Sequence, residues 1–180
     1  NPKFSLLLKL HFSDRTEYVL SDDQWKCDCA GSYIRFNQLR SGEYHDYRFQ
    51  DDWKNSDFDD EKWANAVFSK NVPKGVFREC TCQPIREHEE YSAADIFENA
   101  DGMWVIDFGQ NLSGYLKMRL KQPEGDKIVI RYAERLFSDG RRDDNGVEYS
   151  RFYPETPYQT DSFICNGKVV EFKPKFVYHG

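Results

Sequence analysis

The sequence lacks any long run of hydrophobic residues, which excludes a membrane-spanning helix because such a helix needs about 20 consecutive apolar residues. Positive charge is also scarce. The 25 lysines and arginines are outnumbered by 31 aspartates and glutamates, which gives a formal net charge of −6. Because a nucleic-acid surface needs a basic stripe, this balance argues against nucleic acid as a partner.

Cysteine is too sparse for a disulfide framework. The five cysteines are an odd number, so at least one thiol is unpaired; they are Cys27, Cys29, Cys80, Cys82 and Cys165. The two Cys-x-Cys pairs invite comparison with zinc sites, but paired zinc ligands are usually separated by two or more residues. We interpret them as free cysteines on strands, which favours a cytoplasmic location over a secreted one.

No helix of ordinary length is evident, and short alternating segments rich in aromatic residues predict an all-β fold. The residues Phe, Tyr and Trp make up 16% of the chain. At the amino end, residues 4–12 alternate apolar and polar side chains around a lysine, without a small-residue cleavage site. This period of two indicates a strand and not a signal peptide, and residues 16–20 predict its partner.

Two hairpins are predicted in the second half of the chain. The first joins Tyr115–Leu120 to Lys127–Tyr132 through a turn that contains proline and glycine. The second joins Asp161–Asn166 to Val169–Phe172, and its Asn-Gly dipeptide favours a type I′ turn.

Between residues 103 and 120 an apolar strand breaks at a polar segment that glycines bracket. Side chains in this break, Asp107 and Asn111 among them, are candidates for lining a sugar pocket. The preferred interpretation is that they satisfy backbone groups in the bend, which Asp and Asn side chains often do.

These segments carry a family resemblance. The chain resembles bacterial α-L-rhamnosidases in five motifs that occur in the family's order; they span residues 41–48, 59–63, 105–111, 133–140 and 174–180. The resemblance implies a jelly-roll β-sandwich of the galactose-binding-like type, with extra amino-terminal strands. We expect residues 1–36 to be strands that end a preceding β-domain or close the next one. Residues 37–180 would form the sandwich, truncated at its carboxyl end.

The resemblance also implies a function. In this family the catalytic carboxylates lie in a separate helical domain further along the same chain, so this region alone is expected to be inactive. Its expected role is to support that domain and to bind L-rhamnose, while the parent enzyme hydrolyses terminal α-L-rhamnosides. A purely structural module without a ligand and a self-sufficient glycosidase remain as alternatives.

Some rhamnosidases carry a jelly-roll module that holds rhamnose through calcium, so the resemblance suggests a calcium ion here. Glu43 and Asp46 are the candidate metal ligands. Asn37, a further candidate at the same site, and Trp53, as a stacking platform, are candidates for binding the sugar. Glu43 and Asp46 are an odd number of residues apart, so on a regular strand they face opposite sides of the sheet.

Overall fold

The computed structural model describes residues 3–28, 30–49, 52–72, 74–76, 78–143 and 157–180; Cys29 lies outside these ranges. The chain forms two compact units. Unit 1 contains residues 1–31 and 51–85, and unit 2 contains residues 32–50 and 86–180. The expected domain boundary between residues 36 and 37 stays a prediction.

Unit 1 contains two small antiparallel sheets. Strands β1 (Leu7–His11) and β2 (Thr16–Leu20) form a hairpin, in which Lys9 pairs with Tyr18. This confirms both strands expected from the alternation at the amino end. The second sheet pairs β3 (Lys26–Cys27) with β6 (Ala64–Asn65).

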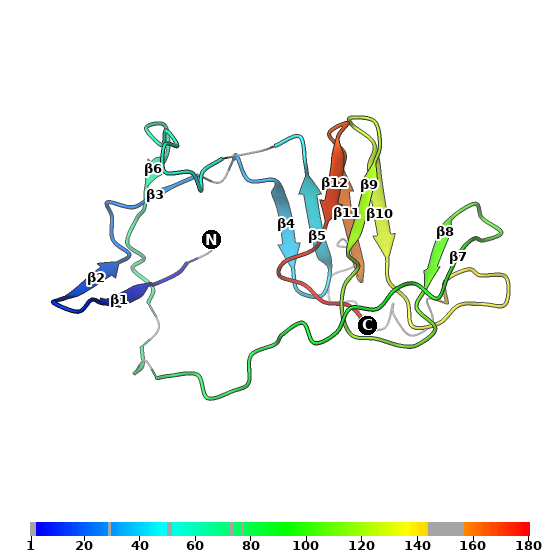
Figure 1. The fold of residues 1–180 in the computed structure, drawn as a ribbon, viewed down its shortest axis with the longest axis horizontal. Coiled ribbons are helices and arrows are strands. Elements are labelled where there is room, and N and C mark those ends of the chain that lie inside the picture. Colours follow the sequence, from blue (N-terminus) through cyan, green and yellow to red (C-terminus); the bar gives the residue numbers. More distant parts are fainter. Residues whose placement is uncertain (1–2, 29, 50–51, 73, 77, 144–156) are drawn as a thin grey trace. The chain divides into compact units, whose positions relative to one another are not determined.

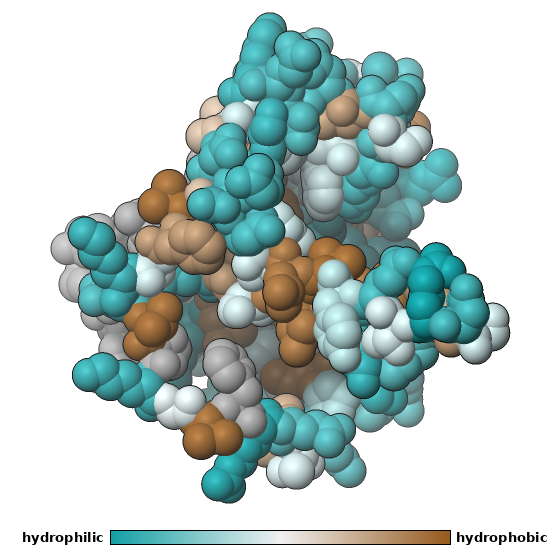
Figure 2. All heavy atoms as spheres, turned by 90° about the vertical axis from the view of Figure 1, so that its left-hand side faces the viewer, coloured by the Kyte–Doolittle hydropathy of each residue, from teal (hydrophilic) through white to brown (hydrophobic). Residues whose placement is uncertain are grey.

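Unit 1 buries little. None of its described residues is fully buried, and several large hydrophobic side chains are more than half exposed; among them are Phe4, Leu7, Val67, Phe68, Val72 and Val76. Hydrophobic side chains also lie among hydrophilic ones on the face seen in Figure 2. The core of the protein therefore belongs to unit 2.

The largest sheet lies in unit 2 and has the strand order β10-β11-β5-β4 (Figure 1). Its strands are β4 (Ile34–Gln38), β5 (Gly42–Asp46), β10 (Lys127–Arg131) and β11 (Thr160–Ile164). Most pairs are antiparallel, but β5 and β11 run parallel, so residues far apart in the sequence become neighbours at the centre of the sheet.

Two further sheets of unit 2 have two antiparallel strands each. One pairs β9 (Met118–Lys121) with β12 (Val169–Phe172), and the other pairs β7 (Asp95–Glu98) with β8 (Trp104–Asp107). The break after β8 thus follows a separate two-stranded sheet.

The prediction of two hairpins in the second half was wrong. Strand β9 pairs with β12, and β10 pairs with β11, so each of the two turns connects different sheets. Gly167 has a φ of 76°, whereas Asn166 has no positive φ, so their turn is not type I′. The alternation of side chains fixes which face is apolar, but it does not fix which strand is the partner.

The core lies between the β12-β9 sheet and the four-stranded sheet. Phe163, Cys165, Val170 and Phe172 are buried together, and apolar side chains of β9 and β10 pack against them. The rings of Phe163 and Phe172 stack at 4.8 Å between their centroids. A turn that crosses between the sheets lets the strands on both sides of it place apolar residues in this core.

All regular elements among the described residues are strands, which confirms the all-β prediction. The described residues include no helix long and apolar enough to cross a membrane. A jelly-roll order of strands stays a prediction.

Candidate functional site

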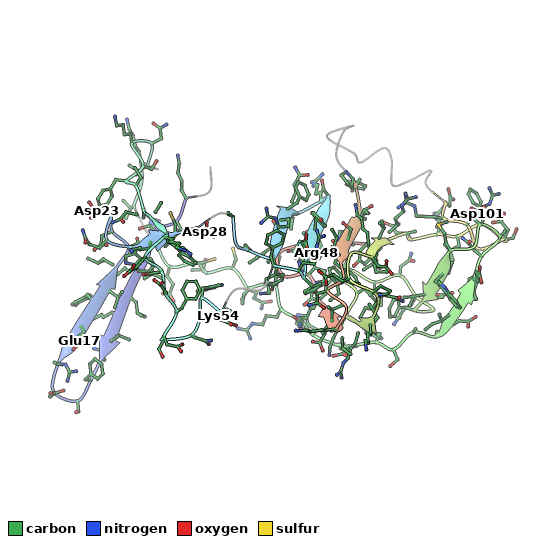
Figure 3. The ribbon with its side chains drawn as sticks, turned by 90° about the horizontal axis from the view of Figure 1, so that it is seen from above. Glu17, Asp23, Asp28, Arg48, Lys54 and Asp101 are labelled. Carbon is green, nitrogen blue, oxygen red and sulfur yellow. The ribbon has the colours of Figure 1, made fainter. Side chains whose placement is uncertain are left out.

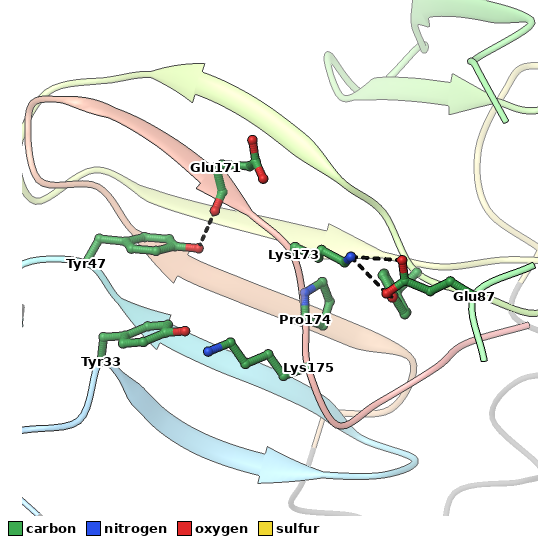
Figure 4. A pocket seen from close by; sticks show the side chains of 8 residues that line it. Tyr33, Tyr47, Glu87, Glu171, Lys173, Pro174 and Lys175 are labelled. Carbon is green, nitrogen blue, oxygen red and sulfur yellow. Dashed lines mark hydrogen bonds and ion pairs between the residues drawn. The ribbon is translucent and has the colours of Figure 1, made fainter. Parts of the chain in front are cut away.

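Unit 2 contains a cavity of about 440 Å³ beside the segment that follows β12 (Figure 4). Five separate stretches of chain contribute to its lining, which consists of Tyr33, Tyr47, Glu87, Tyr115, Glu171, Lys173, Pro174 and Lys175. Aromatic and charged side chains therefore dominate the cavity.

Two parallel tyrosines form one wall. The rings of Tyr33, just before β4, and Tyr47, just after β5, stack with their centroids 5.8 Å apart and their planes at 17°. The Tyr47 hydroxyl donates to the Glu171 carbonyl oxygen at 3.0 Å, and burial raises its pKa well above the usual value. No other described residue hydrogen-bonds to the Tyr33 hydroxyl, which leaves it free for a ligand.

A charge-neutral cluster forms the opposite wall. The Lys173 Nζ lies 2.8 Å from Glu87 Oε1, and the Tyr115 hydroxyl donates to the same oxygen. The hydrogen bond from Lys173, and then that from Tyr115, lowers the pKa of Glu87. This carboxylate is thus held ionised, which makes it unsuited to donate a proton to a leaving group.

Lys175 supplies a charge without a counter-ion. Its Nζ lies 5.1 Å from the centroid of the Tyr33 ring, and no carboxylate of the described residues lies within ion-pair distance. The carboxylate of Glu171 points away from Lys175 in Figure 4. As far as the described residues go, Lys175 therefore gives the cavity an ammonium group without a counter-ion at its Tyr33 end.

Beneath the cavity, Glu43 on β5 is buried, with 1% of its surface exposed. Its Oε1 accepts from Asn37 Nδ2 at 2.7 Å and from the Phe176 amide at 2.6 Å. Its Oε2 accepts from His45 Nε2 at 2.6 Å and from the Lys175 amide at 3.0 Å. Burial alone would raise the pKa of Glu43, but His45 and the two amides outweigh it and lower the pKa.

A second buried carboxylate continues the network. Asp161 on β11 accepts from the Glu43 amide at 2.8 Å, from His179 Nε2 at 3.1 Å and from the Tyr132 hydroxyl at 2.7 Å. Burial, followed by the charge of Asp161, raises the pKa of Tyr132. His179 also stacks on Tyr132 at 4.0 Å and exchanges backbone hydrogen bonds with Gly114. The network thereby ties residues 174–180 to the sheet.

Of the residues expected to form a calcium site, Asn37 and Glu43 lie together and Asp46 does not. Asp46 faces the other side of β5, where Arg48 (labelled in Figure 3) donates to it from Nη2 at 2.7 Å and Nε at 2.9 Å. Arg48 lowers the pKa of Asp46. Because both Glu43 oxygens are taken by protein donors and Asp46 is paired, these residues do not fit a calcium ion as arranged.

Metal ligands are not clustered elsewhere in the described ranges, where no group of three or more His, Cys, Asp or Glu side chains could hold an ion. Cys27, Cys80, Cys82 and Cys165 are free thiols.

The other expected sugar-binding residues do not line the cavity. Trp53 belongs to unit 1, where it is 51% exposed and Lys54 Nζ lies 5.6 Å from the centroid of its ring. Asp107 ends β8, and its Oδ1 accepts from the Gly109 amide at 2.7 Å, which is the backbone role considered for it. Asn111 is exposed beyond this bend.

Sequence reasoning missed the residues that do line the cavity. One signal was present, because Tyr47, directly after β5, continues the period of two that places Glu43 and His45 on one face of that strand. Glu87 gave no such signal. It lies outside any regular element, and only folding brings it to Lys173.

Comparison with known families identifies related proteins. Residues 1–89 match the model of the alpha-L-rhamnosidase N-terminal domain, and residues 97–180 match that of the bacterial alpha-L-rhamnosidase concanavalin-like domain. An alpha-L-rhamnosidase of Formosa agariphila is 32% identical over 99% of this chain, and one of Alteromonas sp. is 27% identical over 99%. This chain spans 19% of the length of each of them.

Solved structures agree with the sequence comparison. An alpha-L-rhamnosidase from Dictyoglumus thermophilum has a TM-score of 0.84 and 30% identity, with 98% of this chain and 19% of that one covered. The alpha-L-rhamnosidase of Streptomyces avermitilis complexed with L-rhamnose also has a TM-score of 0.84, at 27% identity, with 97% of this chain and 16% of that one covered.

Proposed function

Because this chain belongs to the bacterial alpha-L-rhamnosidases, whose N-terminal and concanavalin-like domains it spans, we propose that it is a non-catalytic accessory region of such an enzyme. In this proposal the region supports a catalytic helical domain of the same protein, and the whole protein hydrolyses terminal α-L-rhamnosides. A jelly-roll arrangement of the sandwich belongs to the same proposal.

The proposal rests on the observation that three carboxylates are already hydrogen-bonded or ion-paired within the protein. A glycosidase needs two carboxyl groups that flank the scissile bond, one of them able to donate a proton. Here Glu43 and Asp161 are buried and accept from neighbouring donors, while Glu87 is paired with Lys173. Their arrangement suits holding a sandwich rigid, and it leaves none of these three carboxyl groups available as a general acid.

The test compares the isolated chain with the whole protein on a chromogenic α-L-rhamnoside. We expect no turnover by the isolated chain. In the whole protein, Glu87→Gln should leave kcat unchanged, and Glu43→Gln should lower the melting temperature while folded enzyme keeps its kcat. Turnover by the isolated chain that either substitution removes would overturn the accessory role.

Saccharide binding by this region is the second candidate, and the cavity lined by tyrosines favours it. Sugar sites combine an apolar wall with a few fixed polar groups, and Tyr33, Tyr47 and Lys175 provide such a set. Titration of the chain with L-rhamnose, followed by NMR, tests this candidate. If millimolar rhamnose shifts no tyrosine or lysine signal, the region does not bind rhamnose.

A further inference from the structure

We propose that the cavity binds saccharides that carry an anionic group, a carboxylate or a sulfate, and that Lys175 selects for that group. This inference rests on the saccharide-binding candidate above and adds which chemical class of saccharide the cavity takes. Three observations carry it, namely the charge balance of the cavity, the way Lys175 is anchored and the free hydroxyl beside it.

The lining residues carry no net charge as a whole, because two glutamates and two lysines contribute to them, but the local charge at the Tyr33 end favours an anion. Of its two lysines, Lys173 is neutralised by Glu87, whereas Lys175 has no counter-ion among the described residues. Glu171 presents its backbone carbonyl to Tyr47, and Figure 4 shows its carboxylate directed away from Lys175. A ligand that enters at the Tyr33 end therefore meets an uncompensated ammonium group, which an anionic substituent can pair with.

The anchoring of Lys175 fixes where that charge is presented. Its backbone amide donates to the buried Glu43 carboxylate at 3.0 Å, and the preceding Pro174 is fully buried. The side chain itself is exposed and extends along the Tyr33 ring. Because this backbone is already fixed, binding of a ligand at the solvent-facing ammonium group loses less conformational entropy than binding at a mobile loop would.

The neighbouring tyrosines explain why the ligand should be a sugar and not a bare anion. The Tyr33 hydroxyl has no partner among the described residues and can donate to or accept from a sugar hydroxyl. The paired rings of Tyr33 and Tyr47 add an apolar surface for the C–H groups of a pyranose. Anion, hydroxyls and ring would then be recognised by adjacent groups of one wall.

Calorimetry or NMR titration of the chain with matched ligands tests the inference. The ligands are methyl β-D-glucuronide, its neutral counterpart methyl β-D-glucoside, glucose 6-sulfate, L-rhamnose and sodium acetate. We expect the glucuronide, the sulfate or both to bind about fivefold more tightly than the glucoside, the order that an exposed ion pair contributes. Lys175→Met should abolish that difference and leave glucoside binding unchanged. Lys168→Met, an exposed lysine outside the cavity, is the control and should change neither.

The outcomes separate this inference from the proposals it rests on. Equal binding of glucuronide, sulfate and glucoside, or a preference that survives Lys175→Met, would overturn the anion selectivity and leave saccharide binding in place. Failure of every sugar, rhamnose included, would overturn both, while the accessory role is judged by the activity assay alone. If acetate binds as tightly as the glucuronide, the cavity is a general anion site, and this result would also overturn the inference.

Discussion

The carboxylate of Asp161 accepts a hydrogen bond at 2.8 Å from the backbone amide of Glu43, across the parallel pairing of β11 and β5. Both side chains are buried, and each binds a buried histidine, His179 for Asp161 and His45 for Glu43. The centre of the sheet is therefore held by charged and polar groups that satisfy one another, beside an aromatic core.

Replacement of Glu43 by glutamine should destabilise the protein by about 2–4 kcal/mol, since an amide cannot accept all four donors that the carboxylate accepts. Urea unfolding measures the loss. Hydrogen exchange locates it, because the amides of Lys175 and Phe176 lose their acceptor and should exchange faster. Glu90→Gln, whose side chain is 76% exposed, is the control and should change stability by less than about 0.5 kcal/mol. Unchanged exchange at Lys175 and Phe176 would contradict the network.

Stability should also depend on pH through Glu43. Its pKa in the folded state lies below its ordinary value, so its stabilising contribution is fully present above the unfolded pKa of about 4.3. That contribution is lost as the pH falls through the folded pKa. The free energy of unfolding, measured between about pH 6 and 3, should therefore fall with acid, and the fall should be smaller in Glu43→Gln. An equal acid dependence in both proteins would show that Glu43 is not the group that titrates.

Gly42→Ala should be among the most damaging substitutions in the chain. Gly42 has a φ of 126°, and a Cβ there would lie 2.0 Å from the Thr160 carbonyl oxygen. Gly125→Ala is the matched control, because its φ is 93° but no atom lies within 4 Å of the added Cβ. We expect a loss of about 3 kcal/mol or more for the first and about 1 kcal/mol for the second. Equal losses of stability in the two variants would mean that backbone strain alone, and not the clash with Thr160, causes the effect.

Truncation of Phe172 should cost about 3–5 kcal/mol, since its side chain is fully buried and stacked on Phe163. Phe176→Ala provides a control four residues away, at a side chain that is 62% exposed. Thermal unfolding of the two variants should differ clearly, with the Phe176 variant close to the parent. A similar melting temperature for both would mean that the core does not depend on β12.

The sequence predicted strands better than it predicted their partners. Alternation placed β1 and β2 correctly, because in a hairpin of adjacent strands local pattern and pairing coincide. For β9 and β10 the pattern was equally clear, yet the pairing is non-local, with Leu120 opposite Val170 and Ile128 opposite Phe163. Apolar alternation carries no information about which distant strand completes a sheet.

The cavity was beyond sequence reasoning for a related reason. Tyr33, Glu87, Tyr115 and Lys175 come from separate segments, and no short-range spacing connects them. Motif-based reasoning favoured Trp53 and Asp46 instead, because acidic and aromatic residues near a recognisable strand attract a binding interpretation. In the structure Asp46 forms an ion pair with Arg48, and Trp53 belongs to the other unit.

The parallel pairing of β5 with β11 has a consequence for the order in which the protein is made. Glu43 and Asp161 are separated by 118 residues of chain. At about 5–20 residues per second, a ribosome needs about 6–24 s to produce the second strand after the first. During that time β5 has an unpaired edge on the side that β11 will occupy. The Glu43 carboxylate also lacks the amide donors of Lys175 and Phe176. Nascent chains should therefore depend on chaperones in this interval, and slow closure of the central sheet should limit the folding rate.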